Sequence, residues 1–152
     1  MELSEIQAIL DRAQVLHLAM IDGDRPYVVP LHYGYTLEEG RLTFFLHSAR
    51  EGRKLDVLQK NHRVAFVLET DVSLISGGDL ACKYGSAFAS VMGEGQATLL
   101  TDPDQKAAAL QILMGTQTGR DFSITPAMTE AVAVIRVDVD SFSAKARRKP
   151  DR

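Results

Sequence analysis

Residues 40–61 read GRLTFFLHSAREGRKLDVLQKN and join a strand directly to a helix. The first part is rich in the large apolar and aromatic residues that are typical of strands. Residues 48–51, Ser-Ala-Arg-Glu, match a capping box, and the apolar residues of LDVL (55–58) follow at helical spacing. We therefore expect a strand that ends at His47 and a helix that begins at Ser48.

On both sides of this stretch, the chain consists of strand-like runs and short turns. Asp22-Gly23-Asp24 has the composition of a turn and separates VLHLAMI (15–21) from PYVVPLHYGY (26–35). Pro26 and Pro30 cannot donate hydrogen bonds to a neighbouring strand, so the second run is expected to lie at a sheet edge or to carry an irregularity where it passes a ligand. Further strands are predicted at 63–71, 88–100 and 131–142, and short helices after Ser4 and after Asp102, with loops at 73–85 and 115–129.

Antiparallel strands with short connections and brief helices favour a sheet that closes on itself, because closure removes exposed edges. We predict a mainly β fold, a closed or half-closed barrel of antiparallel strands with a few peripheral helices. Residues 1–145 form its single domain, and the basic run at 146–152 forms a solvated tail. The order of elements does not fit a doubly wound parallel sheet.

Composition limits the possible settings. The 152 residues, 45% of them apolar, contain no uninterrupted apolar stretch long enough to span a membrane. The N-terminus lacks the features of a secretory signal, and the single cysteine, Cys82, cannot form an internal disulfide, so a cytoplasmic location is expected. The net charge of −3 argues against a general nucleic-acid surface.

The start of the helix predicted after His47 has the chemistry of an anion site. Unpaired amides at a helix N-terminus attract phosphate. Ser48 adds a hydroxyl, Gly52 permits close approach of the backbone, and Arg53 and Lys54 add two cations. The same residues also fit an ordinary solvated helix start, and the residues alone leave both interpretations open. The chain has no Walker loop and no Gly-x-Gly-x-x-Gly fingerprint.

Three blocks occur in the order found in a known family: residues 16–35, 40–66 and 90–97 (SVMGEGQA). The chain resembles the FMN-binding split barrels related to pyridoxamine 5′-phosphate oxidase, most closely the nitroimidazole-reductase branch. The resemblance implies a homodimer with flavin mononucleotide (FMN) at the interface. One departure lies in CKYGSAFASV (82–91), where alanines stand in place of basic and aromatic residues.

The resemblance also implies a set of cofactor-binding residues. Arg53 and Lys54 are expected to hold the flavin phosphate, and Ser90 to reach the cofactor from the neighbouring subunit. A strand carrying two prolines is expected to run along the flavin ring. The full set is Val28, Val29, Pro30, Leu31, His32, His47, Ser48, Arg53, Lys54 and Ser90.

The function implied is an oxidoreductase that passes electrons from NADH or NADPH to a small acceptor such as a nitroimidazole or a quinone. His47 is the candidate catalytic residue, because an imidazole beside the cofactor can supply a proton near neutral pH. The alternatives are a non-catalytic module that stores or senses flavin, and a split barrel that uses haem or a deazaflavin. No metal site is expected; His17 is interpreted as a core histidine, and Cys82 as an ordinary buried or loop residue.

Overall fold

The computed structural model describes residues 1–150, in which seven strands form one antiparallel sheet. The strands are β1 (Val15–Asp22), β2 (Arg25–His32), β3 (Gly34–Glu38), β4 (Arg41–Ser48), β5 (Arg63–Ile75), β6 (Gly85–Leu100) and β7 (Ala133–Arg147). Their order in the sheet is β2-β1-β5-β6-β7-β4-β3, so β2 and β3 are the end strands. The predicted mainly β split barrel is confirmed.

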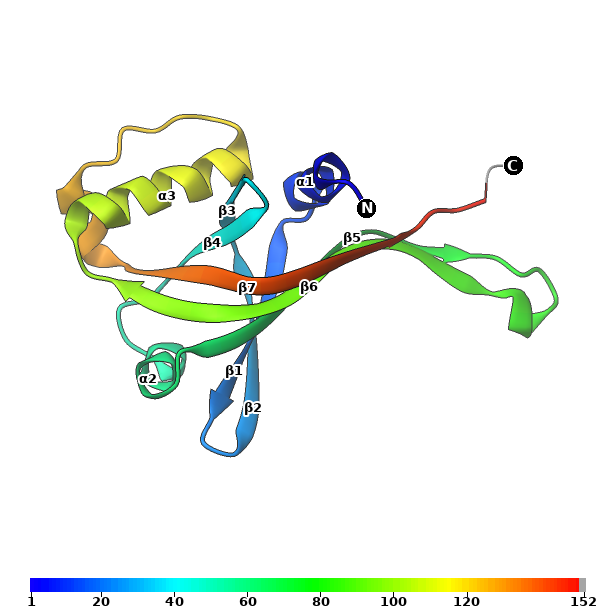
Figure 1. Ribbon diagram of the computed structural model, residues 1–152, viewed down its shortest axis with the longest axis horizontal. Helices are drawn as coiled ribbons and strands as arrows, with labels where there is room; N and C mark the ends of the chain where they lie inside the picture. The colour runs from blue at the N-terminus through cyan, green and yellow to red at the C-terminus, as the bar shows by residue number, and fades with distance from the viewer. Residues whose placement is uncertain (151–152) are drawn as a thin grey trace.

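Helices cover the openings and outer surface of this curved sheet (Figure 1). They are α1 (Leu3–Arg12), α2 (Arg53–Lys60) and α3 (Pro103–Thr118), with short 3-10 helices η1 (Ala81–Lys83) and η2 (Pro126–Ala131). α3 packs on β3 and β4, and α2 packs beside β1. Within residues 1–150, none of the helices is both long enough and apolar enough to cross a membrane.

The core lies inside the barrel because alternate residues of each strand are apolar. Leu16, Leu18 and Met20 of β1 are buried, whereas the residues between them are only partly so. Phe44 of β4 meets Phe66 of β5 with ring centroids 4.8 Å apart. This alternation is the period-2 pattern expected of a strand with one face in a core.

Both predicted capping boxes are wrong, although both helices exist. α1 begins at Leu3, and its capping box uses Glu2 and Glu5 instead of Ser4. α2 begins at Arg53 with Gly52 as its N-cap, four residues after the predicted N-cap Ser48. The reason for the second shift is tertiary: Ser48 is still paired with Ala133 of β7, so the predicted N-cap residue belongs to β4.

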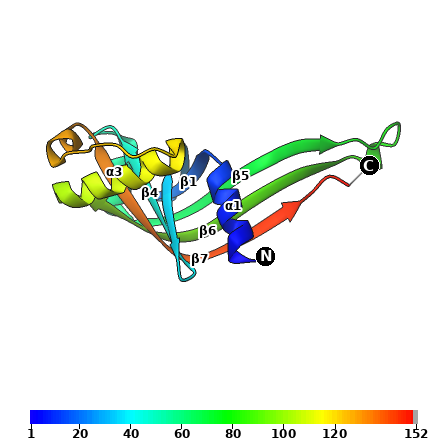
Figure 2. The same ribbon diagram turned by 90° about the horizontal axis from the view of Figure 1, so that it is seen from above.

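Several elements run further than the sequence indicates. The two ends of the predicted loop at 73–85 belong to β5 and β6, because β5 continues to Ile75 and β6 begins at Gly85. These strands extend as a two-stranded arm away from the barrel (Figure 2). α3 continues to Thr118, into the loop predicted at 115–129. β7 continues to Arg147, so residues 146–147 of the predicted tail pair with β6. Pairing with a neighbouring strand supplies hydrogen bonds that local composition does not reveal.

Gly34 is expected to be essential for the packing of α3. A Cβ atom built on Gly34 would lie 2.4 Å from the backbone Cα of Leu113, and backbone atoms cannot rotate away. We expect Gly34→Ala to lower the free energy of unfolding by about 1–3 kcal/mol, the typical cost of overpacking. Urea denaturation measures this.

The control is Gly115→Ala. Gly115 lies in α3, the helix that contains Leu113, and nothing lies within 4 Å of a Cβ atom built on it. Alanine is the better helix former, so this variant should be more stable than the wild type by roughly 0.5–1 kcal/mol. Equal effects of the two substitutions would contradict the proposed close approach.

Candidate functional site

β2 has a free edge, as its prolines predicted. It is the end strand of the sheet and pairs only with β1. Because proline cannot donate to the ladder, Pro26 and Pro30 are expected to direct their nitrogens away from β1. Successive residues of a strand direct their main-chain groups to alternate sides. Val28 and His32 lie two residues from a proline, so their amides also face the free edge. The edge therefore offers main-chain donors and acceptors to a ligand.

The N-terminus of α2 lacks a side-chain cap. The N-cap residue is Gly52, and no side chain accepts from the first-turn amides. Gly52 has a φ of 143°, a conformation that residues with a Cβ rarely adopt, and the space around its Cα is open. The first-turn N–H groups thus remain available, and they carry the positive end of the helix dipole.

Three basic side chains from different elements come together near this helix start. Lys54 of α2 is half-buried, and partial burial lowers its pKa. The pKa of His47 at the end of β4 is also lowered, first by partial burial and then by the charges of His32 and Lys54. The ion pairs of residues 1–150 provide no carboxylate partner for Lys54. His32, His47 and Lys54 therefore form a cationic cluster whose charge comes mainly from Lys54, because the lowered pKa of His47 favours its neutral imidazole near pH 7.

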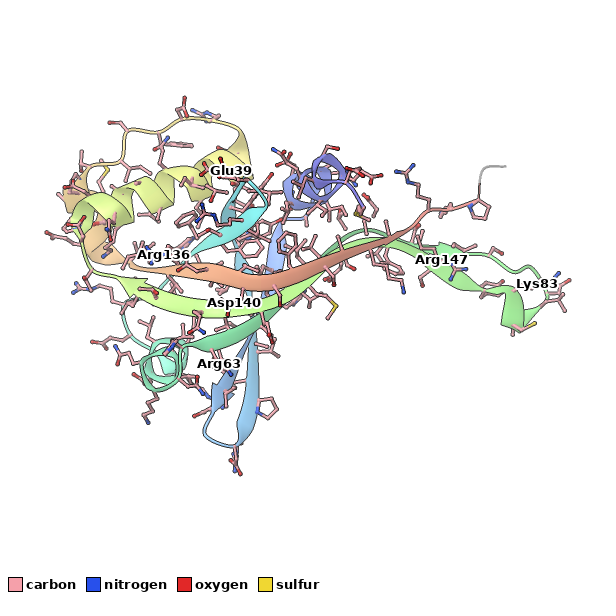
Figure 3. The ribbon with its side chains drawn as sticks, in the orientation of Figure 1. Glu39, Arg63, Lys83, Arg136, Asp140 and Arg147 are labelled. Carbon is pink, nitrogen blue, oxygen red and sulfur yellow. The ribbon has the colours of Figure 1, made fainter. Side chains whose placement is uncertain are left out.

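Arg63, Lys83 and Arg136 do not join this cluster. Figure 3 shows Arg63 and Arg136 at separate places on the barrel and Lys83 out on the arm. Arg136 is also paired with Asp138, at 3.0 Å between Nε and Oδ2. A second group of cations, Arg12, Arg147, Arg148 and Lys149, lines a pocket that also contains the carboxylates of Glu5 and Asp71. Arg12 and Arg148 are paired with these carboxylates, whereas Lys54 has no such partner within residues 1–150.

Arg53 is held differently from Lys54. Its Nε and Nη2 atoms both donate to Oδ2 of Asp22, at 3.1 and 2.9 Å. Its guanidinium also lies over the ring of Tyr27, 4.0 Å from the centroid. Asp22 ends β1 and Tyr27 lies in β2, so Arg53 joins the β1–β2 hairpin to α2. The sequence alone predicts neither partner, because Asp22 has only the pattern of a turn residue.

The remaining residues of the predicted set differ in their exposure and in their distance from the cationic cluster. Val28 is 60% exposed, whereas Val29 and Leu31 pack against the core from the other face of β2. The hydroxyl of Ser48 donates to the carbonyl of Ala49 at 2.9 Å. Ser90 lies on β6, separated from β2 by β1 and β5. Three strand spacings amount to about 14 Å, so within one chain Ser90 does not join the cationic cluster.

His17 is not the core histidine that the sequence predicted. It lies on the outer face of β1, half-exposed, with Nε2 3.2 Å from Oε1 of Glu69 on β5. The alternation of β1 decides this, because Leu16 and Leu18 occupy the inner positions on either side. Cys82 is exposed in η1, on the arm.

Comparison with known proteins identifies the family. The sequence model of the family described as pyridoxamine 5′-phosphate oxidase matches residues 2–146. The chain belongs to this family. Among curated proteins, a search found no significant match. The pyridoxamine 5′-phosphate oxidase family accounts for the whole barrel, including the stretch from β4 to α2 that carries the cationic cluster.

Solved structures resemble the chain over nearly its whole length. A candidate 5-nitroimidazole antibiotic resistance protein from Bacteroides thetaiotaomicron is 29% identical, with a TM-score of 0.78 over 94% of this chain and 82% of its own. Two others are more distant and share the fold. The flavocytochrome Anf3 from Azotobacter vinelandii is 24% identical (TM-score 0.74; 98% and 69% covered). The FAD and haem binding protein from Mycobacterium smegmatis is 16% identical (TM-score 0.79; 99% and 74% covered).

Proposed function

We propose that this member of the pyridoxamine 5′-phosphate oxidase family binds FMN and passes electrons from reduced nicotinamide to a small acceptor such as a nitroimidazole or a quinone. One observation carries the binding part of the proposal. His32, His47 and Lys54 converge on a helix start whose first-turn amides have no side-chain cap. Such a site is complementary to a phosphate dianion. The acceptor class follows the likeness to the Bacteroides protein.

The residues present fit the phosphate end of FMN. Within residues 1–150, Lys54 is a half-buried ammonium without a carboxylate partner, and a phosphate would supply a counter-charge. The amides of the first turn of α2 would bind phosphate oxygens, with Gly52 leaving the approach open. Arg53 would contribute the part of its guanidinium that Asp22 does not occupy. Flavin supplies the redox chemistry when bound.

The free edge of β2 would orient the ring. Its main-chain groups between Val28 and His32 are available, and the adjacent outer face is partly apolar. A planar, polar-edged ring needs both kinds of contact. His47, next to this strand, would hold a proton for the acceptor.

A second copy of the chain would complete the site. The outer face of the sheet leaves several apolar side chains in solvent, with Val28 60% and Met92 56% exposed. Val67 lies opposite Met92 in the register of β5 and β6, so these residues form part of a continuous surface. A self-complementary contact between two such faces would cover it. Ser90 lies on the same strand as Met92 and would reach the cofactor of the other copy.

The proposal is tested by comparing ligands that differ only at the phosphate. We expect FMN to bind at least tenfold more tightly than riboflavin, because the phosphate contributes charge-assisted hydrogen bonds. Flavin fluorescence quenching measures both dissociation constants. Equal affinities for FMN and riboflavin would contradict the proposed phosphate site. The absorption spectrum of the purified protein separates flavin from the haem alternative, which would show a Soret band.

The affinity for FMN should depend on the protonation of His47. Its pKa lies below 6.5 in the free protein, and a nearby phosphate would raise it again. Binding then takes up a proton, so the contribution of His47 to affinity grows as pH falls through the pKa of the complex. It levels off below the pKa of the free protein.

The phosphate of FMN itself titrates near pH 6, in the opposite direction. The informative quantity is therefore the ratio of FMN affinities of the wild type and His47→Gln between about pH 5 and 8. We expect this ratio to increase several-fold toward low pH. A ratio that stays constant over this range would place His47 away from the phosphate.

A further inference from the structure

We propose that Asp22 is a positioning residue that holds the guanidinium of Arg53 in the orientation that binds the cofactor phosphate. This inference rests on the proposed function, and it assigns a role to a residue outside the set that the sequence predicted. The two residues are 31 positions apart and meet at 2.9 Å. Asp22 would touch no ligand and would act through Arg53 alone.

The hydrogen-bond pattern leaves one end of Arg53 free. Nε and Nη2 both donate to the same oxygen, Oδ2 of Asp22. The guanidinium has further N–H groups, both on Nη1 and the second one on Nη2. These form the fork at the far end of the side chain, which matches two oxygens of a phosphate. Asp22 therefore occupies the side of the guanidinium that phosphate does not need.

Tyr27 restricts the remaining freedom of the guanidinium. The ring of Tyr27 lies under the guanidinium of Arg53, whose Cζ is 4.0 Å from the ring centroid. Tyr27 of β2 therefore restricts the plane of the guanidinium, and Asp22 of β1 restricts its rotation within that plane. An unrestrained arginine has many rotamers and loses that freedom when it binds a ligand. Arg53 has already lost it, and its side chain is still 54% exposed and open to a ligand. The hairpin thus preorganises the cation.

A competing role for Asp22 makes the opposite prediction. If Asp22 blocked Arg53, removing its carboxylate would strengthen phosphate binding. If the ion pair were only an ordinary surface contact, its removal would change little, because exposed pairs contribute little. The open Nη1 end of Arg53 favours positioning over blocking. When the carboxylate of Asp22 is removed, positioning predicts weaker FMN binding, blocking predicts tighter binding, and an ordinary surface contact predicts little change.

The test measures the dissociation constants of FMN and riboflavin for Asp22→Asn. We expect FMN affinity to fall about tenfold and riboflavin affinity to stay within twofold of the wild type, so that the discrimination between the two ligands narrows. Asp24→Asn, in the same turn but without an ion pair in the described residues, is the matched control and should change neither constant. In an Arg53→Ala background, Asp22→Asn should have no further effect.

Thermal melting shows whether Asp22→Asn folds. If it does not, variants of Tyr27 provide the test. Tyr27→Leu removes the aromatic face and should weaken FMN binding several-fold, while Tyr27→Phe keeps the ring and should not. Unchanged or tighter FMN binding in Asp22→Asn, or equal loss of FMN and riboflavin, would overturn the inference. Equal affinities of the two ligands in the wild type would instead refute the phosphate site on which it depends.

Discussion

Lys54→Ala is expected to weaken FMN binding by about 1.5–3 kcal/mol, a loss of roughly ten- to 150-fold, while leaving the fold intact. Lys54 is half-buried at the start of α2, lies close enough to His47 to shift its pKa, and has no carboxylate partner within residues 1–150. A cation in such surroundings gains more from a dianion than an exposed lysine does. Isothermal calorimetry or flavin fluorescence gives the affinity, and urea denaturation checks the fold.

Lys60→Ala is the matched control, because Lys60 is exposed in the last turn of the same helix. It should change FMN affinity by less than twofold. Arg53→Ala should weaken FMN binding by a similar amount to Lys54→Ala. It also leaves Asp22 without its ion-pair partner. If Lys60 mattered as much as Lys54, the assignment of phosphate to the start of α2 would be wrong.

His47→Ala is expected to slow the reoxidation of reduced flavin by a nitroimidazole or quinone by about 10²-fold or more, the usual contribution of a positioned acid. The acceptor gains a proton when it is reduced, and His47 is the imidazole at the end of β4 that lies near both β2 and Lys54. The affinity for FMN should change less than in Lys54→Ala. Anaerobic reduction with NADH or NADPH, followed by rapid mixing with the acceptor, measures the step.

The pH profile of reoxidation adds a second readout. The fraction of His47 that carries a proton falls as pH rises through the pKa of its imidazole in the FMN complex, and the wild-type rate should fall with it. Unchanged reoxidation in His47→Ala would leave His47 with its role at the phosphate and without a role in proton transfer to the acceptor. If neither nicotinamide bleaches the flavin, and chemically reduced flavin reacts no faster than free FMN, the chain is a flavin-binding module.

The candidate site divides into parts that were predictable and parts that were not. The helix start with Arg53 and Lys54, and the edge position of β2, follow from short patterns: two adjacent cations after a glycine, and two prolines in one strand. The proximity of His32 to His47 and Lys54, and the anchoring of Arg53 by Asp22, do not follow from such patterns. These interactions join β1, β2, β4 and α2, whose spacing along the chain carries no sign of their proximity.

The sequence by itself determined the class of fold, because alternation, turn residues and the prolines of β2 act locally. Asp102 also caps α3 as predicted, accepting from the amide of Gln105 at 3.0 Å. Only the tertiary structure decided where α2 begins, how far β5 and β6 extend, and on which face His17 lies. Pairing of Ser48 with Ala133 keeps residue 48 in the sheet, although its local sequence fits a helix cap equally well. Long-range pairing outweighs local preference at such positions because each added ladder step satisfies backbone groups that a frayed strand would leave unpaired.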